Sequence, residues 1–410
     1  MDILLINHYA GSLKHGMEYR PFYLAREWVR AGHRVTIAAA SVSHVRTVAP
    51  EVSGTVAEEE IEGVRYLWFK TPLYRGNGAA RALNMLGFVG QLLRHKEALA
   101  RCCMGGAAIA SSTYPLDVLP AALIARSAGA RLVYEVHDLW PLSPIELGAM
   151  SPRHPFIVVM QRAENFAYRH ASKVISMLPK AEPHMRRHGL ASGKFVHIPN
   201  GIDMDGWNSG AENVPEGHRR ALDRSRVHGA FTVLYAGAHG LANALDSVVH
   251  AADLLREEPV TVLLVGQGPE KPSLERLATR LGVANVVFLP PVPKAAIPAL
   301  LEAADALLIP LRRSSIFRFG VSPNKLIDYM MAGKPVIQAI EAGNDMVAES
   351  GCGISVRPED PGVIADAVRQ LMGLTPAERE AMGACGRAYA TARHDYRVLA
   401  RHFIEALEAA

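Results

Sequence analysis

The sequence has little cysteine, with four residues in a chain of 410. Cys102 and Cys103 are adjacent, Cys352 and Cys385 stand apart, and none has the spacing of a metal site. Neighbouring cysteines rarely bridge each other. We therefore expect no disulfide framework, no cysteine-ligated metal, and a reduced cytoplasmic protein.

Long apolar runs are missing too. No stretch approaches the roughly 18 apolar residues of a membrane span, and the opening MDILLINHYA reads as a short strand and not as a signal peptide. Low-complexity segments and short-period repeats are also absent. With 49% hydrophobic and 20% charged residues, the chain has the composition of a soluble globular protein, and its length favours two domains.

The formal net charge of +4 conceals an asymmetry. Of the 44 basic and 40 acidic residues, 23 and 15 fall in residues 1–200, which gives +8 there and leaves 21 against 25, or −4, in the remainder. A basic first half indicates an anionic partner such as a membrane surface or nucleic acid, with chance surface composition as an equal alternative.

Apolar runs of strand length alternate with segments of helical period, which predicts an α/β protein with parallel sheets. In the first half these strands begin at residues 2, 34, 107, 131, 173 and 195; the pattern restarts with strands at residues 231, 260, 286, 304 and 335. We expect two Rossmann-like domains, 1–205 and 206–392, facing each other across a cleft, with a C-terminal helix at 393–410 packing back on the first domain. Ligand-binding loops should follow the carboxyl ends of the strands.

The stretch FGVSPNKLIDYMMAGKPV contains a lysine in an unfavourable place. Ser322 and Pro323 predict a helix N-cap and first position, and Gly333 predicts the end of that helix. Lys325 would then lie in the first turn, where the helix dipole disfavours a cation by roughly 0.3–1 kcal/mol. A surface pair with Asp328 is one explanation. A bound diphosphate, with Asp328 accepting hydrogen bonds from a ribose, explains the position better.

Other chemical groups follow predicted strands. Gly237 and Gly240 end one strand and could admit a phosphate to backbone amides, or could simply make a tight turn. His137 and Asp138 emerge from another strand as candidate catalytic or sugar-binding groups, with loop packing as the alternative.

Two further segments have weaker signals. The loop GSLKHGMEYR could contact an acceptor or a phosphate through Gly11, His15, Gly16, Glu18 and Arg20. The sequence DMD at 203–205 resembles a metal-binding pair of aspartates, but we interpret it as a turn, and no metal is expected.

The run PNKLIDYMMAGKPVI resembles the donor-site helix of retaining glycosyltransferases of the GT-B fold, family 4, most closely the branch that builds bacterial O-antigen, capsule and exopolysaccharide and includes N-acetyl-L-fucosamine transferases. Supporting segments are EVHDLWP, IPNGID and YAGAHGLANALD. The resemblance implies transfer of an N-acetylated amino sugar from a nucleotide diphosphate, expected to be UDP, without metal or cofactor. The catalytic positions it implies are His137, Asp138 and Lys325. The donor-binding positions are Gly237, His239, Gly240, Asn243, Gly266, Pro291, Val292, Gly320, Val321, Ser322, Asn324, Lys325, Leu326 and Asp328.

The match departs from the family at the E-x7-E motif. Asp328 takes the place of the second glutamate, which binds the donor ribose, whereas the first glutamate falls at Gly320. Backbone amides from Gly320 to Ser322 are expected to substitute for it.

A second departure concerns the cations. The arginine and lysine usual after the YAG strand are replaced by His239 and Asn243 nearby, which leaves Lys325 as the main cation for the diphosphate. His137 matches the family's histidine near the reacting carbon of the donor sugar. Because no carboxylate nucleophile stands out, a front-face attack assisted by the leaving phosphate is expected.

The expected acceptor is a glycan on a polyprenyl diphosphate, bound by the first domain at the anionic inner face of the plasma membrane. Basic side chains at Arg75, Arg81, Arg94, Lys96 and Arg101 would meet that surface. Nucleic acid is not an expected partner. Two alternatives stay open: a nucleotide-sugar 2-epimerase on the same fold, and a non-catalytic module that binds sugar nucleotides or nucleic acid.

Overall fold

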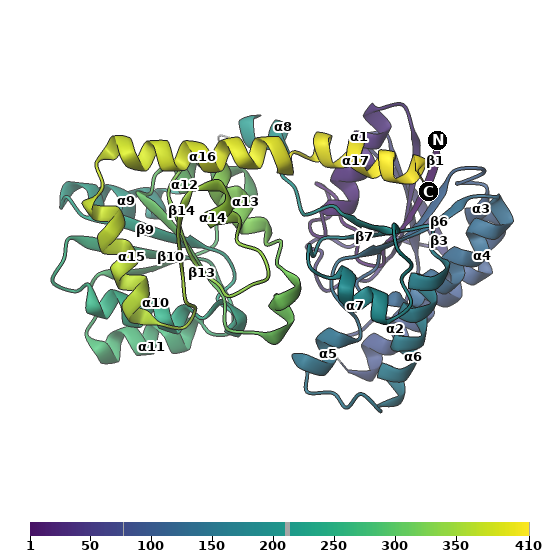
Figure 1. Ribbon diagram of the computed structural model, residues 1–410, viewed down its shortest axis with the longest axis horizontal. Helices are drawn as coiled ribbons and strands as arrows, with labels where there is room; N and C mark the ends of the chain where they lie inside the picture. The colour runs from purple at the N-terminus through teal and green to yellow at the C-terminus, as the bar shows by residue number, and fades with distance from the viewer. Residues whose placement is uncertain (77, 210–213, 410) are drawn as a thin grey trace. The chain divides into compact units, whose positions relative to one another are not determined.

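The computed structural model describes residues 1–76, 78–209 and 214–409, and the chain divides into two compact units (Figure 1). The first unit is Met1–Asn200 with Tyr396–Ala410, and the second is Gly201–Asp395. The chain thus passes between units after residues 200 and 395, against the expected boundaries at 205 and 392.

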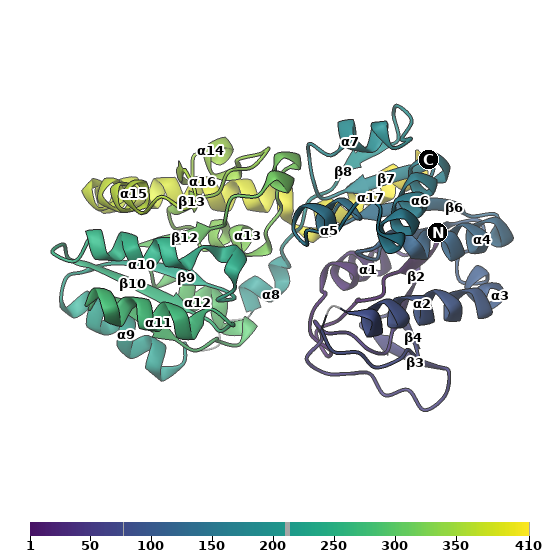
Figure 2. The same ribbon diagram turned by 90° about the horizontal axis from the view of Figure 1, so that it is seen from below.

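The first unit is built on an eight-stranded sheet of order β3-β4-β2-β1-β5-β6-β7-β8, parallel except for the antiparallel β3–β4 hairpin. Its strands are β1 Asp2–Ile6, β2 Arg34–Ala40, β3 Val56–Ile61, β4 Val64–Phe69, β5 Ala107–Ala110, β6 Arg131–Val136, β7 Lys173–Ser176 and β8 Phe195–His197. The hairpin was not predicted from the sequence, because β3 is VAEEEI and has no buried side chain. Figure 2 shows the hairpin beside α2, at one end of the sheet.

Helices cover both faces of this sheet. They are α1 Arg20–Arg30, α2 Ala79–Arg94, α3 Lys96–Ala100, α4 Val118–Ala128, α5 Leu142–Glu146, α6 Pro155–His170, α7 Glu182–Arg187 and α17 Tyr396–Glu408, with the 3-10 turn η1 Pro115–Asp117. The C-terminal α17 packs against α1 (Figure 1). Trp28 of α1 donates from Nε1 to the Ala400 carbonyl at 3.1 Å, and its ring meets Phe403 edge-on.

The second unit has a fully parallel sheet of order β11-β10-β9-β12-β13-β14. Its strands are β9 Phe231–Ala236, β10 Val260–Val265, β11 Val286–Leu289, β12 Ala306–Pro310, β13 Val336–Ala339 and β14 Gly353–Val356. Its helices are α8 Met204–Ser209, α9 Glu216–Val227, α10 Leu245–Leu254, α11 Lys271–Leu281, α12 Ile297–Glu302, α13 Asn324–Met331, α14 Met346–Ser350, α15 Pro361–Gly373 and α16 Pro376–His394, with the 3-10 turns η2 Leu241–Asn243, η3 Lys294–Ala296 and η4 Ser315–Phe319.

Two separate apolar cores lie on the two faces of this second sheet. Buried side chains of α12, α13 and α16 pack on one face, and those of α10, α11 and α15 pack on the other (Figure 1). Strands buried on both faces are what a parallel sheet covered by crossover helices requires.

In both sheets the strand order reverses beside the first strand, between β1 and β5 and between β9 and β12. Open parallel sheets bind ligands at the carboxyl ends of the strands at such a point. The expectation of an α/β chain with two Rossmann-like domains is therefore confirmed. Over the described part of the chain, no helix is both long and apolar enough to cross a membrane.

The DMD sequence was interpreted as a turn, and this was only partly right. Residues up to Asp203 are irregular, but α8 begins at Met204, so Asp205 lies in the first turn of a short helix. A search of the described residues finds no group of three or more His, Cys, Asp or Glu side chains that could hold a metal ion.

Candidate functional site

The amino end of α13 lies beside the reversal point of the second sheet. The helix begins at Asn324, with Pro323 as its N-cap and no side-chain cap, so the expected cap by Ser322 is corrected. The amides of Asn324 and Lys325, in the first turn, have no intrahelical acceptor, as in every α-helix. Gly333 follows the helix with φ +65°, the left-handed conformation that ends helices.

Lys325 does not pair with Asp328. Its ammonium donates to Tyr235 Oη and to Asn243 Oδ1, both at 2.9 Å, and lies 4.6 Å from the centre of the Tyr235 ring. Tyr235 belongs to β9 and Asn243 follows it, so the loop after one strand holds a side chain from the helix after another. Both partners are neutral, and burial lowers the pKa of Lys325 to about 8.

Asp328 lies one turn further along α13, half-buried. Burial raises its pKa to about 6, and the Lys294 ammonium opposes that rise. Lys294 was not predicted as a site residue, because its effect on Asp328 depends on the loop after β11 returning to α13. This loop also contains Pro291 and Val292; Pro291 is exposed and Val292 packs against the apolar core.

Tight glycine contacts join the loops after β9 and β10. A Cβ on Gly237 would lie 2.9 Å from Lys325 Nζ, one on Gly266 would lie 1.9 Å from the Gly237 carbonyl oxygen, and one on Gly268 would lie 2.3 Å from that of His239. Side chains at Gly266 or Gly268 would push the two loops apart, and one at Gly237 would displace the Lys325 ammonium. Gly240 is under no such constraint, since its only near neighbour would be 3.8 Å away.

His239 is completely buried, which corrects the expectation that its side chain reaches a ligand. Its backbone amide donates to the Gln267 carbonyl at 2.9 Å, and the ring lies near Tyr235 and Phe288. Burial and, to a smaller extent, the Lys271 cation lower its pKa to about 4. The neutral ring therefore supports the loop that carries Asn243.

The loop before α13 is held by contacts within the domain. Gly320 has φ +98°, a conformation that favours glycine, and its amide donates to the Phe317 carbonyl at 2.8 Å. The Val321 amide donates to Asn344 Oδ1 at 2.8 Å. These two amides are already used, so they do not fit the expected role as substitutes for the missing glutamate. Leu326, another expected donor-binding residue, is fully buried in the core, so its side chain does not fit that role.

In the first unit, His137 belongs to a chain of hydrogen bonds at the carboxyl ends of β5 and β6. Ser111 donates from Oγ to Glu135 Oε2 at 2.6 Å, and His137 Nε2 lies 2.9 Å from the same Ser111 oxygen. A serine hydroxyl has one proton, and the ionised carboxylate can only accept. His137 Nε2 must therefore carry the proton that it donates to Ser111, and Nδ1 lies outside this chain of hydrogen bonds.

Glu135 is ionised because of Arg20. Burial acts to raise the pKa of Glu135, but the Arg20 guanidinium and His137 outweigh it and hold that pKa at about 2. Arg20 Nε lies 3.0 Å from Glu135 Oε1, and a second nitrogen donates to the Ile198 carbonyl at 2.9 Å. Arg20 is 1% exposed. An acceptor contact, as expected for Arg20, does not fit this position.

Asp138 has local partners. Its Oδ1 accepts from the Leu139 amide at 2.9 Å and from Ser143 Oγ at 2.7 Å, which ties the end of β6 to α5. Burial raises its pKa. These contacts position the segment that follows His137.

The expected acceptor loop folds on itself. The Gly11 amide donates to the Glu18 carbonyl at 2.8 Å, and a Cβ on Gly11 would lie 1.9 Å from the Gly16 carbonyl oxygen. His15 uses both ring nitrogens, on the Val48 carbonyl and on Glu59 Oε2. His15 and the two glycines therefore shape the loop, and of the expected acceptor residues Glu18 is left half-exposed.

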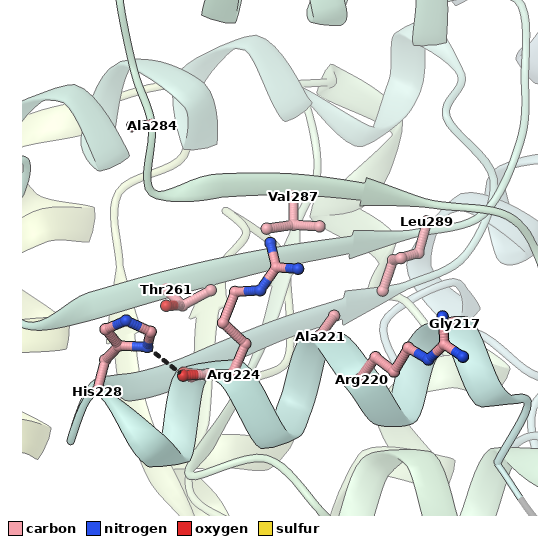
Figure 3. Close-up of a pocket in the computed structure, with 10 residues that line it drawn as sticks. Gly217, Arg220, Ala221, Arg224, His228, Thr261, Ala284, Val287 and Leu289 are labelled. Carbon is pink, nitrogen blue, oxygen red and sulfur yellow. Dashed lines mark hydrogen bonds between the residues drawn. The ribbon is translucent and has the colours of Figure 1, made fainter.

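The second unit also contains a cavity of about 490 Å³ (Figure 3). It is formed by one side of α9, including Arg220 and Arg224, and by Val287 and Leu289 of the edge strand β11. None of the site residues predicted from the sequence lines it.

Two family descriptions match the chain, one in each domain. "Glycosyl transferase 4-like domain" matches residues 15–201, and "Glycosyl transferases group 1" matches residues 230–373.

Similar proteins bear related names. The chain is 27% identical over 289 residues to WcaI of Escherichia coli K12, named a colanic acid biosynthesis glycosyl transferase, covering 69% of each chain. It is 23% identical over 275 residues to the glycosyltransferase WbjE of Pseudomonas aeruginosa, covering 66% of this chain and 67% of that protein.

Solved structures show the same fold. Anabaena HepE in complex with UDP matches with a TM-score of 0.71 at 18% identity, covering 100% of both chains. WaaG, a glycosyltransferase of lipopolysaccharide biosynthesis, matches with a TM-score of 0.67 at 17% identity, also over 100% of both chains. With glycosyltransferase matches in both domains and this fold throughout, the chain belongs to the GT-B glycosyltransferases.

Proposed function

We propose that this glycosyltransferase moves a sugar from a UDP-linked donor to a lipid-linked glycan in surface polysaccharide synthesis, with retention and without a metal. The observation that carries the proposal is Lys325: a largely buried cation with two neutral partners, in the first turn of α13 at the reversal point of the sheet. The UDP bound to HepE and the colanic acid pathway named for WcaI support the donor and the polymer class.

A bound diphosphate would supply the negative partner that the Lys325 ammonium lacks. Anions are favoured at helix amino ends by the dipole and by the unsatisfied amides, here those of Asn324 and Lys325. The same contacts would neutralise the charge that develops on UDP as the sugar leaves. Asp328, one turn on, would accept hydrogen bonds from the ribose.

His137 would act on the transferred sugar through Nδ1. The Ser111–Glu135–Arg20 chain fixes the protonated Nε2 toward the protein, so Nδ1 can accept a hydrogen bond from a sugar hydroxyl. The leaving phosphate would take the acceptor proton in a front-face attack. The N-acetylated amino sugar rests on the family resemblance.

Helix α2 would carry the membrane contact of the first domain. Leu83, Leu86 and Leu93 are 60%, 57% and 41% exposed and follow helical spacing on its outer face. Arg75 and Arg94 are exposed near its two ends. Arg81, expected at the same surface, instead donates to Tyr9 Oη. Exposed leucines flanked by basic residues fit the headgroup region of an anionic bilayer.

Replacing Lys325 by methionine should weaken UDP binding at least tenfold, about 1.4 kcal/mol, because a charge-assisted contact to the diphosphate is lost. Thermal shift and calorimetric titration with UDP, in EDTA, measure it. Lys334→Met, at the other end of α13, is the matched control and should bind as the wild type. Equal UDP affinity in the Lys325 and Lys334 variants would refute the proposed donor site.

UDP affinity should be greatest between about pH 6 and pH 8. Lys325, with a pKa near 8, loses its charge as pH rises, and Asp328, with a pKa near 6, is protonated as pH falls. Each loss weakens binding by up to about tenfold per pH unit beyond its pKa. Titration across pH 5–10 should show Lys325→Arg without the alkaline decline and Asp328→Asn without the acidic one. If the alkaline and acidic declines in UDP affinity persisted in these variants, groups other than Lys325 and Asp328 would be responsible for them.

Ser111→Ala should lower the rate of UDP-sugar turnover about tenfold, because His137 loses the partner that fixes its protonated nitrogen. His137→Ala should lower it further, and the double variant should match His137→Ala alone. Additive losses would mean that Ser111 does not act through His137. Steady-state kinetics with the donor and a circular dichroism melt separate this loss from unfolding.

The double variant Leu83→Ser, Leu86→Ser should bind phosphatidylglycerol vesicles at least tenfold more weakly at low salt. Two leucine side chains that move from water into the bilayer contribute several kcal/mol of transfer free energy, and the serines lose it. Vesicle sedimentation measures it. Leu254→Ser, at a 52% exposed leucine of the second domain, is the control and should bind as the wild type. No vesicle binding by the wild-type protein would remove the membrane contact from the proposal.

A further inference from the structure

A group of basic and phenolic side chains lies at the carboxyl edge of the first sheet. We call it the arginine cluster: Tyr9 after β1, His44 and Arg46 after β2, Tyr74 after β4, and Arg81 in α2. Parallel strands end at this edge on one side of the reversal point between β1 and β5. The proposed function does not use any of the five side chains.

Aromatic hydroxyls hold the outer part of the cluster. Arg81 donates to Tyr9 Oη from two nitrogens, both at 3.2 Å. His44 Nδ1 lies 2.8 Å from Tyr74 Oη, and the His44 ring meets Tyr9 edge-on at 5.3 Å. His44 is exposed and Arg81 and Tyr74 are half-buried, so a proton-donating rim faces solvent.

Arg46 is mostly buried and lies close enough to Tyr74 of this rim for the two side chains to interact electrostatically. One terminal nitrogen donates to the Ala40 carbonyl, and the guanidinium lies 5.0 Å above the centre of the Trp68 ring. Its other two nitrogens, Nε and one terminal nitrogen, are buried without a hydrogen-bond partner among the described residues. Burial lowers the pKa of Arg46 to about 10.

Within the described part of the chain, no carboxylate pairs with Arg46. The acidic groups that act on it are the phenols of Tyr74 and Tyr66, and neither is a carboxylate. The carboxylate of Glu59 is occupied by Lys14, His15 and Trp68. A buried guanidinium without a counter-charge is costly, and in the same domain Arg20 is matched by Glu135. The positive charge of Arg46 is therefore not matched by an anionic group within the cluster.

Exposed leucines beside the arginine cluster indicate that the matching anion belongs to a lipid. Leu73, 84% exposed, lies just before Tyr74, and the outward leucines of α2 are on the same helix as Arg81. A phosphate on a lipid could place its charge on the rim while its chain lies along these leucines. A soluble phosphate would use the rim alone.

We propose that the arginine cluster is a phosphate subsite, in which Arg81 and His44 contact a phosphate group of the acceptor and Arg46 supplies uncompensated positive charge. This rests on the proposed function for the identity of the ligand as acceptor. It adds the residues that would recognise the acceptor's phosphate, distinct from the donor diphosphate at Lys325.

The test is a titration of the full chain with inorganic pyrophosphate, at constant ionic strength and with UDP saturating the donor site. Arg81→Met and Arg46→Met should each weaken pyrophosphate binding at least tenfold. Arg126→Met, an exposed arginine of α4 in the same domain, should bind as the wild type. No pyrophosphate binding by the wild type, or an equal loss in the Arg126 variant, would overturn the subsite.

A structural role for Arg46 makes a different prediction. Arg46→Met would then melt at a lower temperature while its response to pyrophosphate stayed that of the wild type, and this result would also overturn the proposal. UDP affinity, measured in the same variants, should not change. UDP that failed to bind the wild type would contradict the donor site alone.

Vesicles separate the two sources of phosphate. Phosphatidylcholine vesicles containing undecaprenyl phosphate should bind the wild-type protein more tightly than vesicles of equal charge containing phosphatidylglycerol, and Arg81→Met should lose that preference. Equal binding to both, together with pyrophosphate binding, would support a soluble phosphate and overturn the lipid carrier.

Discussion

Parallel strand pairing is the constraint on which the rest of the molecule depends. Strands that run in one direction present all their carboxyl ends at one edge, and each connection must return across a face of the sheet, usually through a helix. This is why Asn243, after β9, meets Lys325, which lies 82 residues further along the chain. It is also why Ser111 and Glu135, from neighbouring strands, meet His137. The chemical groups are brought together by the topology and not by their spacing in sequence.

Three cations in this protein show how the surroundings of a charge separate structural from ligand-binding roles. Arg20 is buried against Glu135 and two backbone carbonyls, so its charge is matched within the domain. Lys325 and Arg46 are also largely withdrawn from water, but their contacts are phenols, amides, a carbonyl and aromatic faces. Because an unmatched buried charge is costly, these two positions are where an anionic ligand is expected. The proposed donor diphosphate would bind at the first position, and the proposed acceptor phosphate at the second.

Much of the fold could be predicted, because its signals are local. Apolar strands buried on both faces, separated by helical periods, indicated the parallel sheets, whereas the polar β3 strand had no such signal. Lys325, Asp328 and His137 could be proposed as site residues because each follows a recognisable strand or opens a helix. The roles expected for Arg20, His15 and His239 did not fit their burial. Their sequence positions were correct for the ligand edge, but only packing decides whether a side chain at that edge points outward.

The sequence by itself determined the class of fold, the sheet edge at which ligands are expected, and the presence of a cation, Lys325, in the first turn of a helix. These depend on hydrophobic period, turn residues and the helix dipole, which act over a few neighbouring residues. Only the tertiary structure decided that Lys325 bonds Tyr235 and Asn243, that Glu135 is ionised by Arg20, and that Arg46 lacks a carboxylate. Charge compensation and desolvation depend on which groups approach through space, and residues that are far apart in sequence supply those groups.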